Sequence, residues 1–273
     1  MEPGPGPGIE PAPHQHPLTA GSFGAEAERY DRARPDYPRD LVERIVAALP
    51  ESPRVLDVGC GTGIVSRQFQ EAGCVMLGVD LDARMADQAR RHGLRVEVAA
   101  FESWDSAGRE FDALVSGQTW HWVDPVAGAT KAARTLRPGG LLAVFWNVAQ
   151  PPPELTRRFA EVYQRVAPDS LAARFWARPA EDAYAKVCNA ASDGLRRANA
   201  FGPAQRWRFE GERMYTRDVW LDQVHTTGGH AQLPPARSAE AAAEIGAAID
   251  AAGGDFTMRY ITLAVVAVRS AAD

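Results

Sequence analysis

Short apolar runs alternate with amphipathic segments over the first half of the chain. Runs of strand length lie at residues 55–58, 75–80, 94–99, 111–116 and 141–146. Between or before them, helical spacing or helix-end residues mark residues 39–49, 62–73, 82–93 and 125–136. This regular strand–helix alternation predicts a parallel, doubly wound sheet, and the nearly unbroken apolar strands are typical of burial on both faces.

The pattern changes after residue 150, where three consecutive prolines interrupt the sheet rhythm. Residues 154–200 place Leu155, Phe159 and Val162 on one helical face, which predicts amphipathic helices. This stretch is too long for a simple crossover helix, so we interpret it as a helical cap over the active site. Further on, strands are expected at 207–209 and 256–268 and helices at 216–225 and 238–252.

The turn after the first strand carries the clearest chemical signal. Asp57 is followed by Gly59, Gly61 and Gly63, and a helical pattern then begins. A strand that leads into such a turn lets a ligand approach bare backbone at a helix N-terminus. Asp80 ends the next apolar run, where a carboxylate can hold the two hydroxyls of a ribose. Together these features indicate an adenosine cofactor.

The spacing of the glycines distinguishes between adenosine cofactors. The dinucleotide fingerprint G-x-G-x-x-G requires a third glycine where this chain has Ile64. The acid at Asp57 would also repel a pyrophosphate, whereas it suits a ligand with a cationic ammonium or sulfonium. An NAD-dependent oxidoreductase is therefore the less favoured alternative.

Three further segments narrow the class. They are Phe23-Gly24 with Tyr30 and RPDYP at residues 34–38, QTWHW at 118–122, and LRPGG with VFWN at 136–147. The whole pattern resembles the class I S-adenosylmethionine (SAM)-dependent methyltransferases, especially the small-molecule subfamily of the trans-aconitate and cantharidin type. The resemblance implies a Rossmann-like, mostly parallel seven-stranded sheet with an antiparallel C-terminal edge hairpin.

The resemblance and the pattern together suggest a division of the chain. We expect a disordered tail at residues 1–20 and a SAM-binding core with an N-terminal lid at 21–150. An inserted helical cap is expected at 151–204. Residues 205–273 would complete the core sheet and add helices that face the substrate.

The resemblance also implies a set of cofactor contacts. These residues are Tyr30, Arg34, Asp57, Gly59, Gly61, Thr62, Gly63, Asp80, Leu81, Met85, Phe101, Glu102 and Gln118. Asp80 would accept from the ribose hydroxyls, and Asp57 would lie near the methionine ammonium, directly or through water. Tyr30 or Arg34 would meet the SAM carboxylate, and the product would be S-adenosylhomocysteine. For Glu102 a solvated loop acid is an equal alternative.

The loop after the fourth strand is the expected reaction centre, because ligands sit beyond the carboxyl ends of parallel strands. Trp120 and Trp122 would shape an apolar pocket, and His121 is the candidate catalytic residue. His121 has three possible roles: general base, donor that orients the substrate, or loop anchor. His225 and His230 are candidates for substrate contact, with ordinary loop histidines as the alternative.

The composition of the chain limits the kinds of partner that are expected. The formal net charge of −5 and the absence of basic runs argue against nucleic acid, and no apolar run approaches the ~20 residues of a membrane span. Three cysteines without C-x-x-C spacing fit a reducing, cytoplasmic setting. No metal-ligand spacing is present. The oligomeric state is not indicated by the sequence.

These observations predict a methyltransferase that acts on a small-molecule acceptor by in-line displacement. Oxygen is the expected nucleophile on general frequency, with nitrogen, sulfur and carbon left open. A capped, tryptophan-lined pocket suits an aromatic or polyketide-like compound or a small organic acid. A SAM-binding module without catalysis is the alternative from another class.

Overall fold

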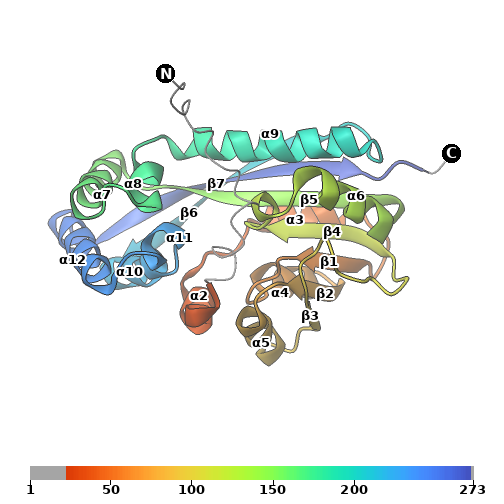
Figure 1. Cartoon of the computed structure of the whole chain (residues 1–273), viewed down its shortest axis with the longest axis horizontal. Helices are drawn as coiled ribbons and strands as arrows, with labels where there is room; N and C mark the ends of the chain where they lie inside the picture. Colours follow the sequence, from red (N-terminus) through yellow and green to blue (C-terminus); the bar gives the residue numbers. More distant parts are fainter. Residues whose placement is uncertain (1–22, 272–273) are drawn as a thin grey trace, which may run out of the picture.

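The computed structural model describes residues 23–271, so the tail expected at residues 1–20 lies outside the described part of the chain. One seven-stranded sheet organises the molecule, in the order β3-β2-β1-β4-β5-β7-β6 (Figure 1). The strands are β1 Arg54–Val58, β2 Val75–Asp80, β3 Val96–Val98, β4 Phe111–Gly117, β5 Leu136–Gln150, β6 Gln205–Thr216 and β7 Asp255–Val268. The first five are parallel, and β7 lies antiparallel between β5 and β6. The predicted fold class is confirmed.

Helices cover both faces of this sheet. Five helices lie against the sheet, and together with it they are called the sheet half below. They are α3 Arg39–Val46, α4 Ile64–Glu71, α5 Ala83–Arg91, α6 Pro125–Thr135 and α9 Ala180–Ala198. Helices α3 and α4 pack on one face and α6 and α9 on the other. The Asp82 side chain caps α5 by accepting from Arg84 N, and Asp124 caps α6 in the same way. The connections are therefore doubly wound, as the alternation predicts.

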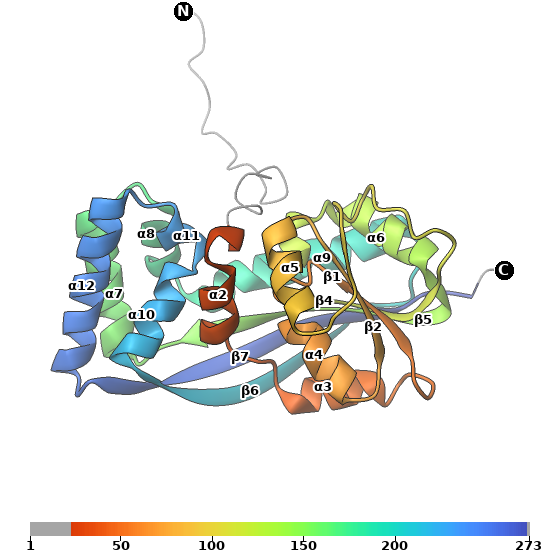
Figure 2. The same ribbon diagram turned by 90° about the horizontal axis from the view of Figure 1, so that it is seen from below.

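The remaining helices gather at one end of the molecule. They are α7 Pro153–Val166, α8 Leu171–Trp176, α10 Arg217–His225, α11 Gly228–Ala231 and α12 Pro235–Ala251. Strands β5, β6 and β7 extend beyond strands β1 to β4 and reach this group (Figure 1). Side chains of α7, α8, α10 and α12 share one apolar core with the ends of β6 and β7. Figure 2 shows α2 (Ala27–Ala33) between this helical group and α5.

Helix α9 takes a different place from the one expected for residues 151–204. It runs along the sheet and packs against α6, β5 and β7 (Figure 1), and of its residues Tyr184 alone lines the cavity described below. The residues that α9 buries are Cys188, Ala191, Gly194 and Leu195. A Cβ at Gly194 would overlap the carbonyl oxygen of Pro125, so the small side chains of α9 allow a close approach to α6.

Two strands begin or end elsewhere than expected. Residues 138–140 do not form a turn before the fifth strand; β5 already begins at Leu136, and its register against β4 shifts between Phe111 and Ala113. Gly139, with φ of 79°, accommodates this irregularity. Strand β6 is longer than the expected residues 207–209, because its exposed face is charged and carries no apolar signal.

Candidate active site

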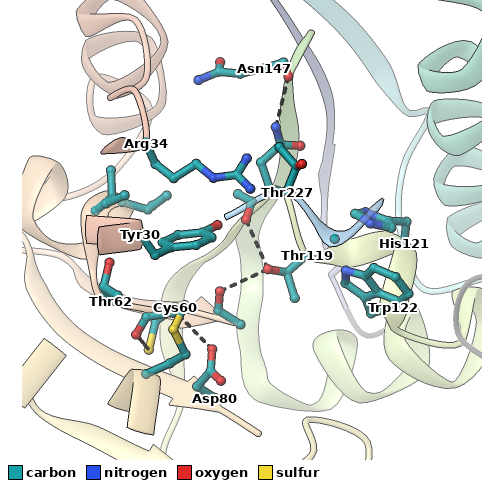
Figure 3. Close-up of a pocket in the computed structure, with 18 of the residues that line it drawn as sticks. Tyr30, Arg34, Cys60, Thr62, Asp80, Thr119, His121, Trp122, Asn147 and Thr227 are labelled. Carbon is teal, nitrogen blue, oxygen red and sulfur yellow. Dashed lines mark hydrogen bonds between the residues drawn. The ribbon is translucent and has the colours of Figure 1, made fainter. Parts of the chain in front are cut away.

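A cavity of about 640 Å³ lies beyond the carboxyl ends of β1, β2, β4 and β5. Residues of α2 and of the helical group close its other sides. Figure 3 shows Tyr30 and Arg34 on one side, His121 and Trp122 on the other, and Asp80 at the bottom. This position is the one where open α/β sheets bind their ligands.

The glycine turn presents its backbone to the cavity. Gly59, Gly61 and Gly63 have φ values of 67°, 54° and 88°, in a backbone region that residues with a side chain rarely adopt. A Cβ at Gly59 would overlap Thr119, and one at Gly63 would overlap Leu94. Gly63 is the N-cap of α4 and lies behind the lining, whereas Gly59, Gly61 and Thr62 line the cavity. The backbone approach expected from the sequence is therefore available.

Asp80 is held rigidly at the end of β2. Its Oδ2 accepts from Gly61 N at 2.7 Å, and its Oδ1 accepts from Asp82 N at 2.9 Å. Burial raises the pKa of this carboxyl group. A carboxylate oxygen accepts more than one hydrogen bond, so two ribose hydroxyls can be held here.

An apolar wall lies beside Asp80. Leu81, Met85 and Phe101 all line the cavity, and Phe101 stacks on Trp104 with 6.5 Å between ring centroids. Glu102 also lines the cavity, and its Oε1 accepts from Asp124 N at 3.1 Å. A flat heterocycle such as adenine fits between these groups.

Asp57 lies beneath the glycine turn and does not line the cavity. Its Oδ2 accepts from Ser66 Oγ at 2.7 Å, while Oδ1 is buried without a hydrogen-bond partner in the described chain. Burial raises the pKa of Asp57 to about 7. This placement favours an effect on a ligand ammonium through the turn or through water over direct contact.

Arg34 joins the N-terminal segment to the helical group. Its Nε donates to Thr226 Oγ1 at 3.1 Å and its Nη2 donates to the Thr226 carbonyl at 2.6 Å. The guanidinium lies 4.8 Å from the centre of the Tyr30 ring. Both side chains line the cavity, so their expected position over the cofactor is available to them.

Gln118 and His121 come from the loop after β4. Gln118 has a φ of 56°, and its Nε2 donates to the Asn147 carbonyl at 2.9 Å. Trp146 Nε1 donates to His121 Nδ1 at 3.2 Å. Because Nδ1 accepts, the proton of the neutral ring resides on Nε2. Burial lowers the pKa of His121 to about 4, so at neutral pH this ring is a hydrogen-bond donor with no free basic nitrogen.

Three predicted substrate residues lie outside the lining. Trp120 is buried in the core, with its ring 6.0 Å from that of Phe101, because the short helix Trp120–Trp122 turns it away from Trp122. His230 is buried between the Tyr163 hydroxyl and the Ser238 hydroxyl, each 2.9 Å away. The His225 ring packs against His230 at 5.0 Å.

Several lining residues were not identified from the sequence. They are Tyr37, Asn147, Tyr163, Phe175, Trp176, Tyr184, Trp220, Gln223, Thr227 and Tyr260. They form an aromatic and amide-lined half of the cavity on the side of the helical group. Their helical or strand periodicity indicated only burial, and no spacing marked them as a set.

A family model described as a methyltransferase domain matches residues 30–244. The chain belongs to this methyltransferase family. The residues described above fit SAM: a bare glycine turn, an acid at the end of β2 that ribose hydroxyls could reach, and a buried carboxylate oxygen beneath the turn that has no partner in the described chain. Membership of this family removes the oxidoreductase alternative.

Curated relatives of the methyltransferase match part of it. The chain is 34% identical over 147 residues to an uncharacterised methyltransferase of Mycobacterium tuberculosis, which covers 53% of this chain and 59% of the relative. It is 32% identical over 171 residues to a malonyl-[acyl-carrier protein] O-methyltransferase of Enterobacter lignolyticus, covering 60% and 65%. The chain thus spans less than two thirds of these relatives' length.

Solved structures support the fold. A structure described as a type II methyltransferase from Anaeromyxobacter dehalogenans has a TM-score of 0.62 and 23% identity, over 87% of this chain and 97% of that one. A methyltransferase assigned to antibiotic biosynthesis in Anabaena variabilis has a TM-score of 0.57 and 15% identity, over 85% and 98%. At these identities the likeness extends to the fold alone.

Two features are absent from residues 23–271. None of the helices described there is long and apolar enough to cross a membrane. No group of three or more histidine, cysteine or acidic side chains in that range is placed to hold a metal ion.

Proposed function

We propose that this enzyme transfers the SAM methyl group to a carboxylate oxygen of a small, largely apolar acid. The proposal rests on one contact, the hydrogen bond from Trp146 to His121 Nδ1. With Nδ1 accepting from Trp146 and burial lowering the pKa of His121 to about 4, this ring offers an Nε2–H donor and is a poor general base at neutral pH. The acceptor oxygen therefore has to arrive already ionised, as carboxylates do.

The charges around the cavity support the same class. Among the described residues, the arginine and acidic side chains that line the cavity are Arg34, Asp80 and Glu102. The two acids lie beside the expected cofactor. The acceptor half therefore has no carboxylate to hold a cationic amine. Arg34 supplies positive charge, and the aromatic side chains favour an apolar body. The O-methyltransferase name of the Enterobacter relative agrees with an oxygen nucleophile.

The step itself is an in-line displacement. The carboxylate oxygen forms a bond to the methyl carbon while the carbon–sulfur bond breaks, giving a methyl ester and neutral S-adenosylhomocysteine. No proton is released. The chain would contribute alignment and exclusion of water. Asp80 would hold the cofactor ribose, and the His121 Nε2–H would orient the acceptor oxygen.

Methyl-labelled SAM tests this proposal against panels of carboxylic acids, phenols, amines and thiols. We expect label in a product that releases methanol on mild base treatment, as a methyl ester does. We also expect kcat/KM for the acceptor, measured at saturating SAM, to stay level between about pH 6 and 9, because neither His121 nor the acceptor titrates there. Saturation with SAM removes the effect of Asp57, which titrates in the ligand-free enzyme. An Asp80→Ala variant serves as the control that loses cofactor binding.

Three outcomes would overturn the proposal. Label in a base-stable ether or N-methyl product would assign another nucleophile. A rate that rises with a pKa near 7 and is lost in His121→Ala would identify a general base. Cofactor binding without turnover on any panel would favour a SAM-binding module.

A further inference from the structure

Strand β6 forms an open edge of the sheet. Among residues 23–271 it pairs only with β7, along all 12 of its residues and without a register shift. Figure 2 shows β6 along the lower margin of the molecule. The backbone groups on its outer side have no strand partner within the described residues, and such a long, regular edge is a template for another strand. Protein edges are commonly protected by proline, a bulge or short length, and β6 has none of these.

On one face of this edge strand, two positively charged side chains are followed by two negatively charged ones. Arg206, Arg208, Glu210 and Glu212 alternate with half-buried residues and are all exposed. They lie on the α9 side of the sheet, where Arg206 Nη2 donates to Asn189 Oδ1 at 2.6 Å. Two arginines thus precede two glutamates. If a second copy of this strand ran antiparallel beside it, arginines would lie opposite glutamates.

We propose that β6 pairs antiparallel with β6 of a second copy of this chain, with Phe209 on the two-fold axis. In this register Arg206 lies opposite Glu212 of the partner subunit, and Arg208 lies opposite Glu210 of the partner subunit. Symmetry doubles both contacts, so four pairs of opposite charge form across the interface.

Neighbouring registers are worse. Side chains alternate between the two faces of a sheet, so the pairing register can change only by steps that leave every side chain on its own face. Moving the axis by one residue in one direction places Arg208 opposite itself, and moving it in the other direction places Glu210 opposite itself. Like charges directly opposite each other destabilise a strand pair. The charge order therefore selects one register.

The opposite face supports the same register independently. There Phe209 meets Phe209 of the partner subunit, and Trp207 lies opposite Gly211 of the partner subunit. A Cβ at Gly211 would meet nothing within 4 Å, so this position is open. Glycine inside a strand often marks the close approach of another group, and an indole can cover it. Within its own chain, Trp207 already has the Arg44 guanidinium 3.9 Å from its ring centre.

Sedimentation velocity with charge variants tests the proposed dimer. We expect the wild-type chain to sediment as a dimer and Glu210→Arg to raise the dissociation constant about tenfold or more. The double variant Arg208→Glu with Glu210→Arg restores the opposite-charge pairs and should restore the dimer. Glu154→Arg, on the exposed α7 pair with Arg157, is the matched control and should remain dimeric.

Melting curves distinguish dissociation from misfolding, because Glu210 also pairs with Arg259 within the chain. A wild-type protein that sediments as a monomer at all accessible concentrations would overturn the proposal and assign the edge charges to protection against pairing. A dimer that survives Glu210→Arg unchanged would also overturn it.

A cysteine at the axis tests the register. Phe209→Cys places two thiols directly opposite each other, within disulfide reach, and should form a crosslinked dimer under mild oxidation. Arg208→Cys and Glu210→Cys should crosslink far less, because each faces a different residue. The three native cysteines are buried and free. Crosslinking at position 208 or 210 in preference to 209 would refute the proposed register.

Discussion

At the scale of single residues, Asp57 combines burial with a missing partner. One oxygen accepts from Ser66 Oγ, and the other has no partner in the described chain. A buried carboxylate is costly, which explains why burial raises the pKa of Asp57 to about 7. A cationic ligand above the turn would lower this cost, so the residue links the stability of the protein to cofactor binding.

This link gives a testable pH dependence. The pKa of Asp57 is higher in the folded state than the 3.8 of an ordinary aspartate, so the unfolded chain ionises first as pH rises. The folded state holds the proton of Asp57 more tightly than the unfolded chain does. The stability that this provides is complete below about pH 4 and is lost by about pH 7. We expect Asp57→Asn to abolish this decline, which is on the order of a few kcal/mol, and to be more stable than wild type at pH 7.5. Urea unfolding of the ligand-free proteins at pH 4.5, 6 and 7.5 measures it.

Ser66→Ala provides the companion variant. Its hydroxyl lowers the pKa of Asp57, so its removal should raise that pKa further and extend the decline in stability to pH values above 7. Parallel stability curves for wild type, Asp57→Asn and Ser66→Ala would show that Asp57 does not titrate in this range.

At the scale of elements, α2 connects the two sides of the cavity. Asp31 accepts from Arg67 of α4 at 2.8 Å and contacts His92, after α5, at 2.9 Å. Towards the helical group, Arg29 and Arg32 reach Asp222 of α10 at 3.4 Å and 3.3 Å. Tyr30 and Arg34, at the same segment, line the cavity. The helix is therefore positioned by contacts to both sides rather than by a core of its own.

Loss of the contacts to the sheet half should weaken cofactor binding. Asp31→Ala removes a partly buried ion pair with Arg67 and the contact with His92. We expect the dissociation constant for SAM to rise roughly tenfold, with a small effect on global stability. Calorimetric titration gives the affinity, and hydrogen exchange in residues 27–33 reports the loosening. Arg39→Ala, which removes an exposed pair on α3, is the control and should change neither. Unchanged affinity in Asp31→Ala would contradict this role of α2.

The elements that sequence predicts well are those whose burial is local. The apolar runs of β1, β2 and β4 are visible in the sequence and were located correctly. Strand β6 was underestimated because half of its positions face solvent.

The two halves of the site differ in the same way. The half of the cavity proposed for the cofactor follows from a contiguous turn and the next strand end, so the sequence could predict that Gly59, Gly61 and Asp80 lie together, and all three line the cavity. The acceptor half joins residues as distant as Tyr37, Tyr184 and Tyr260, which only the tertiary fold brings together. Trp120 and Trp122 show the limit most clearly, because one short helical turn sends the first to the core and the second to the cavity.

At the scale of the whole molecule, the long strands join the sheet half to the helical group. Strands β5, β6 and β7 run through both, and each pairs with its neighbour along nearly its whole length. The apolar core of the helical group includes side chains of β6 and β7 as well as of α7, α8, α10 and α12. The helical group therefore cannot lose its packing without exposing the ends of the strands.

This connection predicts one cooperative unfolding transition. Phe159 of α7 is fully buried and packs against Trp176 and Trp220, with ring centroids 5.3 Å and 6.1 Å away. Its replacement by alanine should cost about 3–5 kcal/mol and lower the midpoint of the single transition. Tryptophan fluorescence and far-ultraviolet circular dichroism should report the same midpoint. Phe69→Ala, in the core between α4 and the sheet, is the matched variant and should shift that transition in the same way. Two separate transitions, with Phe159→Ala affecting only one, would instead show that the helical group is an independent unit and that the long strands do not couple it to the sheet.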